Sequence, residues 1–312
     1  NSAKLLNKSV ISSNLILNLY LCRKFFDIIM LTTSCQTLIA DAGGTTTNWY
    51  LSCSETFTTE GINPFQQSED DIIKIVKDFK KESLPDNILS RIAAIRFYGA
   101  GCTPEKSAIV KNALMQAFEG TVTNIAVYSD LLGAARGLCG REKGVACILG
   151  TGSNSCLYDG EKIVQNTPAL GYILGDEGGG AVLGRMFLNA MLKGRVEQSV
   201  CNDFKATYNM TQADIIERVY RQPLANRFLA SLAVFIGKHR SNPTVRPIIA
   251  ENFANFLDNN IIPYQCKTLH FTGSIAYHFA DILQEIAENK GYEIGKITKS
   301  PIVGLAAFHA KK

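Results

Sequence analysis

Short apolar runs alternate with longer stretches of helical periodicity through most of the chain, and this alternation predicts an α/β fold. In the first half, strands are expected at residues 36–41, 48–53, 55–59, 91–98 and 124–128. Helices are expected after Ser68, which is a plausible N-cap, between Pro104 and Phe118, and from Asp130 onward. The first half therefore has the element order βββαβαβα.

The second half begins with the same pattern. Strands are expected at 145–149, 155–158 and 268–272, and helices at 177–192, 213–239, 248–262, 275–288 and 302–310. When residues 41–51 are set over 149–159, the aligned pairs are Gly44 with Gly152, Thr45 with Ser153 and Thr47 with Ser155. Glycine and threonine are common in hairpin turns, so coincidence is the alternative. The shared element order favours an internal duplication.

The length also favours two domains, because 312 residues is about twice the roughly 150 of a typical domain. The expected division is a first domain at 30–136 and a second at 137–312, which carries a helical insertion. The last helix could pack back on the first domain. Residues 1–29 are rich in Asn, Ser and Lys and are expected to be a disordered or non-native extension. A signal peptide is the alternative, although Asn14 and Asn18 interrupt its apolar core.

Composition narrows the class of protein. With 46% hydrophobic and 19% charged residues the chain can bury a large core, and it is not an intrinsically disordered sequence. A net charge of +4 gives no electrostatic case for a nucleic-acid or membrane partner. The nine cysteines form no CxxC pair, which is typical of reduced thiols in a cytoplasmic protein.

Two turns rich in glycine and threonine carry the first chemical hypothesis. Glycine lets the backbone approach a ligand closely, and the hydroxyls beside it add hydrogen-bond donors, so DAGGTTT (41–47) and GTGSNS (150–155) could each cradle phosphate oxygens. Asp41 ends the first strand, where a carboxylate could hold Mg²⁺ directly or through water. The simpler interpretation is a hairpin with an Asx turn, but the second turn favours a phosphate site.

Asp130 is the candidate general base. It ends the strand NIAVYS and begins the helix LLGAARG, at the carboxyl end of a sheet where side chains reach a cleft. An N-cap role is the alternative and can coexist with the catalytic one. A hydroxyl that attacks a phosphate needs a carboxylate to accept its proton. Other signatures are absent: the chain has no GxxxxGK[ST], and its four histidines share no metal-ligand spacing.

Taken together, six motifs resemble the N-acetylglucosamine kinase group, within the BadF/BadG/BcrA/BcrD-type branch of the sugar kinase, actin and heat-shock chaperone ATPase superfamily. The motifs are DAGGTTT (41–47), SDLLGAARG (129–137), GTGSNS (150–155), GDEGGG (175–180), FTGSIA (271–276) and PIVGLAAFHA (301–310). The resemblance implies a duplicated ribonuclease-H-like fold whose two domains close over ATP and a sugar. It implies an ATP- and Mg²⁺-dependent amino-sugar kinase, in a family whose members are often dimeric.

The resemblance also implies roles for individual residues. Asp130 would take the proton of the sugar 6-hydroxyl, and Asp41 would assist Mg²⁺. The residues implied for ATP are Gly44, Thr45, Thr46, Thr151, Gly152, Gly273 and Ser274. Those implied for the sugar are Asn63, Asp130, Ser153, Asn154, Gly171 and Asp176. For Asp176 an N-cap is again the alternative, but its surroundings are too rich in glycine for a helix start selected for stability alone.

One departure affects the substrate. Family members often carry Gly-Trp-Gly before GDEG, where this chain has Ala169-Leu170-Gly171. The aromatic platform for the sugar is therefore missing, which leaves the sugar open and could admit a bulkier one such as N-acetylmuramic acid. Trp49 is expected in the core instead. Two other functions stay open: an iron–sulfur activator of 2-hydroxyacyl-CoA dehydratases, with Cys139 and Cys147 as candidate ligands, and a non-catalytic sugar sensor.

Overall fold

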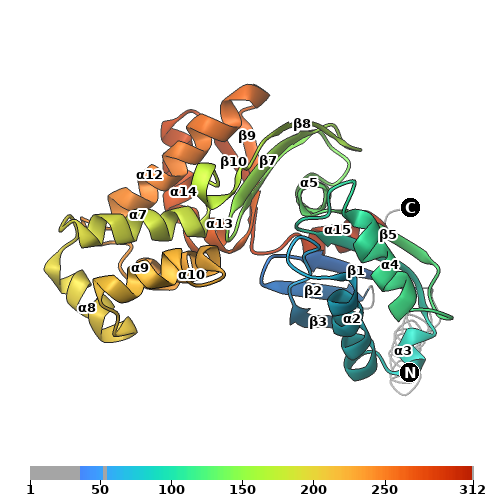
Figure 1. The fold of residues 1–312 in the computed structure, drawn as a ribbon. Coiled ribbons are helices and arrows are strands. Elements are labelled where there is room, and N and C mark those ends of the chain that lie inside the picture. Colours follow the sequence, from blue (N-terminus) through green and yellow to red (C-terminus); the bar gives the residue numbers. More distant parts are fainter. Residues whose placement is uncertain (1–35, 52–54, 311–312) are drawn as a thin grey trace, which may run out of the picture.

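The computed structural model describes residues 36–51 and 55–310 (Figure 1). The expected extension at 1–29 and the end of the strand expected at 48–53 lie outside these residues. Within them the chain forms two five-stranded mixed sheets, which lie in separate lobes in Figure 1. None of the described helices has the length and apolar character needed to cross a membrane.

The first sheet follows the predicted element order closely. Its strands are β1 (Gln36–Ala42), β2 (Thr46–Leu51), β3 (Glu55–Glu60), β4 (Ile92–Gly99) and β5 (Asn124–Ser129), in the spatial order β3-β2-β1-β4-β5. Its helices are α2 (Glu69–Ser83), α3 (Asp86–Leu89) and α4 (Ser107–Ala117). Ser68 caps α2 as predicted, in a reciprocal capping box with Asp71. Trp49 is fully buried and stacks on Phe79 with the ring centroids 4.5 Å apart.

The second sheet repeats the topology of the first. Its strands are β6 (Gly144–Leu149), β7 (Ser153–Tyr158), β8 (Ile163–Thr167), β9 (Thr268–Thr272) and β10 (Glu293–Thr298), in the order β10-β9-β6-β7-β8. Counted from the start of each half, both orders are 3-2-1-4-5. The sequence analysis missed β8 and β10 because both are edge strands with mostly exposed side chains and no clean apolar alternation.

The helices of the second half pack on one another, and several of them share a core with its sheet. They are α6 (Gly171–Leu174), α7 (Gly180–Leu192), α8 (Gln198–Tyr208), α9 (Gln212–Tyr220), α10 (Ala225–Ser231), α11 (Ala233–Lys238), α12 (Arg246–Phe256), α13 (Ser274–His278) and α14 (Ala280–Asn289). The single helix predicted over 213–239 is wrong, because Pro223 and the left-handed Leu224 separate α9 from α10. The helix predicted over 275–288 breaks at Phe279, between α13 and α14.

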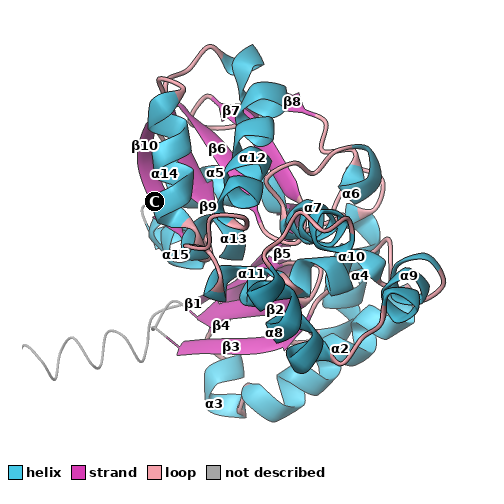
Figure 2. Ribbon diagram, turned by 90° about the vertical axis from the view of Figure 1, so that its left-hand side faces the viewer, coloured by secondary structure: helices cyan, strands magenta, loops and turns pink. Residues whose placement is uncertain are grey.

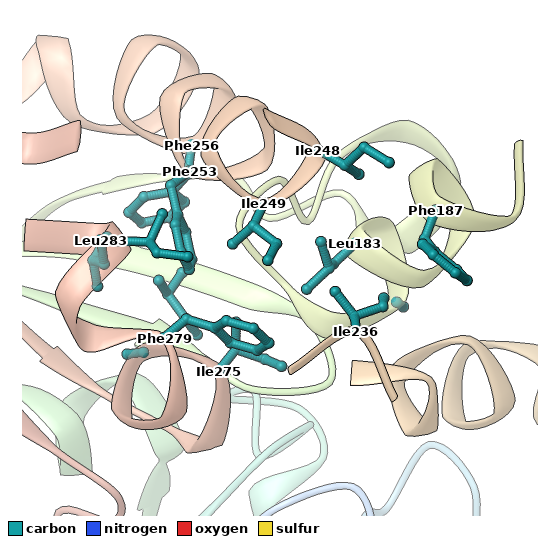
Figure 3. Close-up of a cluster of buried hydrophobic side chains, with 14 of the residues drawn as sticks. Leu183, Phe187, Ile236, Ile248, Ile249, Phe253, Phe256, Ile275, Phe279 and Leu283 are labelled. Carbon is teal, nitrogen blue, oxygen red and sulfur yellow. The ribbon is translucent and has the colours of Figure 1, made fainter. Parts of the chain in front are cut away.

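The largest core lies between these helices and the second sheet. Figure 3 shows Leu183 of α7 beside Ile249 of α12, with Phe187 farther along α7 and Phe279 below. A separate core packs β1, β4 and β5 against α2 and α4. Both cores are dominated by large apolar side chains, whose burial is the main favourable term in folding.

Two helices occupy the region between the sheets. One is α5 (Asp130–Cys139), which packs its Leu131 and Leu138 against β6 and β7 of the second sheet. The other is α15 (Ile302–Ala310), which contacts β1, β2 and α5, with Leu305 buried against Ile39 and Tyr98. Figure 2 shows the molecule turned by 90°. Each helix thus contacts elements of the half to which it does not belong in the chain order.

The crossing of α5 and α15 depends on two glycines. A Cβ placed on Gly304 would lie 1.9 Å from the carbonyl oxygen of Gly137, and a Cβ on Gly137 would lie 2.7 Å from Pro301. Real Cβ atoms do not approach backbone atoms so closely, so any side chain at these positions must push the helices apart.

We expect Gly304→Ala to lower the free energy of unfolding by about 1–3 kcal/mol, because overpacking outweighs the gain in helix propensity. Urea unfolding measures the change. Gly237→Ala in α11 is the matched control, since its added Cβ would meet Phe279 at an ordinary 3.6 Å. An alanine at 304 as well tolerated as the one at 237 would contradict the proposed close crossing.

Candidate active site

Three parallel strands of the first sheet end together at one edge. The register places Ala42 of β1 beside Gly99 of β4, and Gly99 beside Ser129 of β5. Asp41 and Asp130 therefore stand at the same edge, separated by one intervening strand. Carboxyl ends of parallel strands are the usual place for ligand sites in α/β sheets. The structure thus brings the two predicted carboxylates together.

Asp41 projects from the face of β1 that is turned toward α15. Side chains alternate along the strand, so Asp41 shares a face with Ile39, while Leu38 and Ala40 enter the opposite core. Ser300, in the loop before α15, donates a hydrogen bond from its Oγ to Asp41 Oδ2 at 2.7 Å. Burial raises the pKa of Asp41 to about 6, the hydrogen bond from Ser300 opposes this rise, and the charge of Asp130 adds to it.

Asp130 does not cap α5. Ser129 is the N-cap and its side chain accepts from the Leu132 N–H, so Asp130 occupies the first helical position. Its Oδ1 accepts a hydrogen bond from the Leu131 N–H at 2.8 Å. Burial raises the pKa of Asp130 above its usual value, and the backbone donors limit the rise. The capping alternative is therefore wrong, and the carboxylate is available for another role.

Groups from both halves surround Asp130. Burial is the main cause of the raised pKa of Cys102, in the loop after β4, and the nearby charge of Asp130 raises it further. It contributes in the same direction to the pKa of Cys156 on β7 of the second sheet. Helix α5, which Asp130 begins, contacts β4 and β5 of the first sheet and β6 and β7 of the second, so Asp130 starts a helix that both halves share.

The two glycine turns close their hairpins differently. In the first, the Gly43 N–H bonds to the Thr46 carbonyl, and residues 43–46 separate the last ladder pair, Ala42 with Thr47. In the second, residues 150–152 separate Leu149 from Ser153. The second turn is therefore one residue shorter. The sequence alignment of Thr47 with Ser155 is therefore wrong as a structural equivalence. Ser153 is the first ladder residue after the second turn, as Thr47 is after the first.

One cavity of about 710 Å³ joins the two turns. Thr45 of the first turn, Thr151 of the second and Ser274 at the start of α13 all line it. This arrangement brings together three of the predicted ATP-binding residues from distant parts of the sequence. Both turns therefore face a shared space, but neither Asp41 nor Asp130 is among the residues that line it.

The cavity has a marked charge bias. Its basic lining residues are Arg227, Lys238, Arg240 and Lys299, and its described lining includes no Asp or Glu. Ile275, Phe279 and Val234 supply an apolar wall at α11 and α13. A cationic space with an apolar wall suits a ligand that has an anionic part and a flat apolar part.

The second turn is held by Asp176. A Cβ on Gly152 would lie 2.5 Å from Asp176 Oδ2, so only glycine allows this approach. The Ser153 N–H donates to the Asp176 carboxylate, and burial raises the pKa of this group despite that bond. Asp176 has a φ of 57°, and the N-cap of α7 is Gly179. The capping alternative is wrong for Asp176 as well, and α7 begins three residues later than predicted.

Asn63 is placed by another glycine turn. A Cβ on Gly101, whose φ is 77°, would lie 2.4 Å from Asn63 Oδ1. That oxygen accepts from the Phe65 N–H at 2.9 Å, and the Asn63 N–H donates to Gln67 Oε1 at 2.8 Å. Asn63 contacts Gly101, which directly precedes Cys102, and the pKa of Cys102 is affected by the charge of Asp130. Asn63 therefore lies on the Asp130 side of the site.

The remaining predicted residues are less closely connected. The Gly44 carbonyl oxygen accepts a hydrogen bond from Arg227. Gly273 lies close to the carbonyl of Leu149, beside the second turn. Thr46 begins β2 and pairs with Glu60. Asn154 accepts from Asn166 on β8, and Gly171 is exposed at the start of α6. Thr46 directly follows Thr45 of the cavity lining, but Thr46, Asn154 and Gly171 do not line the cavity themselves. Their roles stay predictions.

The described residues include no cluster of side chains that could hold a metal ion without help from other ligands. Among residues 36–51 and 55–310, no group of three or more His, Cys, Asp or Glu side chains could hold a metal ion. Cys147 is fully buried in a core strand, which removes it as a cluster ligand. Mg²⁺ fits this pattern, because it commonly binds through one carboxylate together with phosphate oxygens and water. The assignment of Asp41 to this ion stays a prediction.

Sequence reasoning missed Ser300, Arg227 and Lys299. Ser300 and Lys299 follow β10, a strand without a clear pattern, so no motif marked them. Arg227 is one basic residue within a segment predicted as a continuous helix. Only the folded chain places these residues beside the two turns.

Comparison with known proteins identifies related structures. A Porphyromonas gingivalis protein provisionally named N-acetylglucosamine kinase is 44% identical, with a TM-score of 0.85, and the match covers 88% of this chain and 98% of that one. A provisionally named N-acetylglucosamine kinase from Chromobacterium violaceum shares 16% identity over 88% and 99% of the two chains, with a TM-score of 0.64. No protein-family model and no curated protein matches the chain.

A third similarity concerns the fold alone. A ROK family glucokinase from Streptomyces griseus, in complex with glucose and AMPPNP, is 12% identical over 88% of this chain and 97% of that one, with a TM-score of 0.54. Together with the repeated sheet order, these similarities confirm the predicted duplicated ribonuclease-H-like fold.

The raised pKa of Asp41 predicts a pH-dependent stability. The folded protein holds this proton more tightly than the unfolded chain, so ionisation of Asp41 destabilises the fold; the cost is absent below pH 3.8 and complete above about pH 6. We expect Asp41→Asn to be about 1–3 kcal/mol more stable than the wild type at pH 7.5, and this difference to vanish near pH 4. Urea unfolding at the two pH values measures it.

Ser300→Ala provides a partner variant. Because the Ser300 hydrogen bond lowers the pKa of Asp41, its loss should shift the pH dependence of wild-type stability to higher pH. A stability difference between Asp41→Asn and wild type that is equal at both pH values would contradict the assigned burial of this carboxylate.

Proposed function

Because the chain belongs to the N-acetylglucosamine kinase group of the actin-like sugar kinases, we propose that it transfers the γ-phosphoryl group of ATP to the 6-hydroxyl of N-acetylglucosamine or a related amino sugar. The observation that supports this most directly is the shared cavity. Thr45 and Thr151 line it from opposite turns, and basic side chains surround it. Asp130 follows β5 at the same sheet edge as Asp41 and begins α5, which contacts both sheets. These are the parts that phosphoryl transfer needs.

Asp130 acts as the general base in this proposal. Its position at the first residue of α5 fixes the carboxylate at the strand edge, and its raised pKa makes the ionised form a stronger base. A sugar hydroxyl within hydrogen-bond reach would give up its proton to this carboxylate as the oxygen attacks phosphorus. The Leu131 N–H holds one carboxylate oxygen, which leaves the other for the substrate.

The two turns and Asp41 serve the phosphate groups. Backbone N–H groups and the hydroxyls of Thr45 and Thr151 bind and orient the phosphates at the cavity wall. Mg²⁺, when bound, would neutralise part of the developing phosphate charge. Asp41 would hold it directly or through water, and the pKa of about 6 leaves this carboxylate mostly ionised at neutral pH.

The sugar is assigned to the Asp130 side of the site. Asn63 can donate through its amide nitrogen, since its oxygen already accepts from the Phe65 N–H. Asp176, fixed against Gly152, can accept from sugar hydroxyls next to the second turn. Gly171, Asn154 and Ser153 remain predicted contacts. Closure of the two halves would exclude water and favour transfer to the sugar over hydrolysis of ATP.

The cysteines are the basis for proposing a cytoplasmic location. The six described cysteines, from Cys102 to Cys266, are all free thiols. Free thiols at these six positions support the cytoplasmic location expected from the sequence. The homodimer expected from the family stays a prediction.

Asp130→Asn tests the base. The amide keeps the shape of the side chain but cannot accept the proton, so we expect sugar phosphorylation to fall roughly 10²–10⁴-fold while ATP affinity changes little. A coupled ADP-release assay and calorimetric titration with ATP measure the two quantities. Asp78→Asn, on the exposed side of α2, is the matched control. Near-normal phosphorylation by Asp130→Asn would rule out this assignment.

A substrate screen tests the sugar class. We expect ADP release with N-acetylglucosamine, N-acetylmannosamine or N-acetylmuramic acid to exceed that with glucose and glucosamine by roughly 10²-fold or more in kcat/KM, because a site that pairs an acetamido group loses those bonds with other sugars. Equal rates with glucose would count against Asn63 and Asp176 as specificity residues. No phosphorylation of any of the five sugars would contradict the proposed kinase activity.

A further inference from the structure

Arg227 connects the helical layer of the second half to the first glycine turn. It lies in the middle of α10, more than 180 residues from the turn in sequence. Its Nη2 donates a hydrogen bond to the carbonyl oxygen of Gly44 and a second, of 3.1 Å, to Gln66 Oε1 in the loop after β3. The two halves of the cleft therefore touch through this side chain.

The Arg227 guanidinium has no acidic partner among the described residues, although it lines the cavity. None of the four ion pairs among the described residues includes Arg227. Its Nε is buried and has no hydrogen-bond partner within the described part of the chain. Both of its hydrogen bonds start from Nη2 and go to neutral oxygens. A buried N–H of a charged group without a partner is costly, so a site of this kind is favoured when an anion occupies it.

The surroundings indicate which anion. Arg227 lines the same cavity as Thr45 and Thr151, and its bond to Gly44 places it at the turn that directly follows Asp41. Ser274 and Ile275 line the cavity from α13, next to the apolar wall. A nucleotide with its base against that wall would therefore direct its terminal phosphates toward the first turn and Arg227.

We propose that Arg227 is a ligand of the terminal phosphates of the nucleotide and that it holds the first turn in place between nucleotide-binding events. This rests on the proposed function, since it takes ATP as the phosphoryl donor. Arginine suits the role because its planar fork of N–H donors can bind two phosphate oxygens at once, which a lysine ammonium cannot match in geometry. The guanidinium would also help to neutralise the transferring phosphoryl group, and it comes from the half opposite Asp41.

A purely structural role predicts a different outcome. If Arg227 only tied α10 to the first turn, its loss would lower stability and weaken every nucleotide alike. If it binds the terminal phosphates, its loss must affect ATP and spare AMP, which lacks them. The comparison of the two nucleotides therefore separates the roles.

The experiment is calorimetric titration of the full chain with ATP and with AMP, together with the KM for ATP and the KM for the sugar. For Arg227→Gln we expect ATP affinity to fall roughly ten- to a hundredfold, as for the loss of charge-assisted hydrogen bonds, while AMP affinity stays within about twofold. The KM for ATP should rise and the KM for the sugar should stay unchanged. Arg221→Gln, at an exposed position after α9, is the control for loss of one positive charge.

Arg227→Lys guards against a variant that fails to fold. It keeps the charge but not the fork, so we expect a smaller, severalfold loss of ATP affinity, again without a change for AMP. Unchanged ATP affinity in either variant, or an equal loss for ATP and AMP, would overturn the assignment of Arg227. A wild-type protein that binds no ATP would instead overturn the proposed function itself.

Discussion

The close crossing of α5 and α15 is the constraint on which the site depends. Gly137 and Gly304 let the two helix backbones meet without an intervening side chain. Asp130 begins one of these helices, and Ser300 immediately precedes the other, with its hydroxyl on Asp41. The environment of both carboxylates is therefore set by one helix contact. Their raised pKa values follow from the burial that this contact and the two sheets enforce.

The sequence allowed much of this arrangement to be predicted because the relevant signals are local. Strand β1 followed by DAGG, and β5 followed by Asp130, each show an apolar run ending in a turn or a helix start. Since parallel strands share their carboxyl edge, the meeting of Asp41 and Asp130 follows from the element order. The glycines of both turns gave the second signal, because only such a backbone can approach a phosphate or the Asp176 carboxylate.

What the sequence could not show are contacts between distant segments. Ser300 follows β10, whose exposed edge position removes the alternation that marks a buried strand. Arg227 reaches the first turn only because Pro223 and Leu224 break the predicted helix and redirect α10. The alignment of the two turns was also offset, because a comparison of sequences does not show that one turn has four residues and the other three. In each case the residue's place depends on which distant segments the fold brings together.

The duplicated sheet order has an asymmetric outcome. Strand β1 ends with a carboxylate next to its turn, whereas β6, with the sequence GVACIL, carries none. A hypothetical molecule assembled from two copies of the first half would present two acids to an anionic ligand and repel it. One assembled from two copies of the second would lack a carboxylate at the end of its first strand. The unequal repeats thus differ in charge: the first strand of one half ends in an acid, while the other half supplies the basic side chains of the cavity.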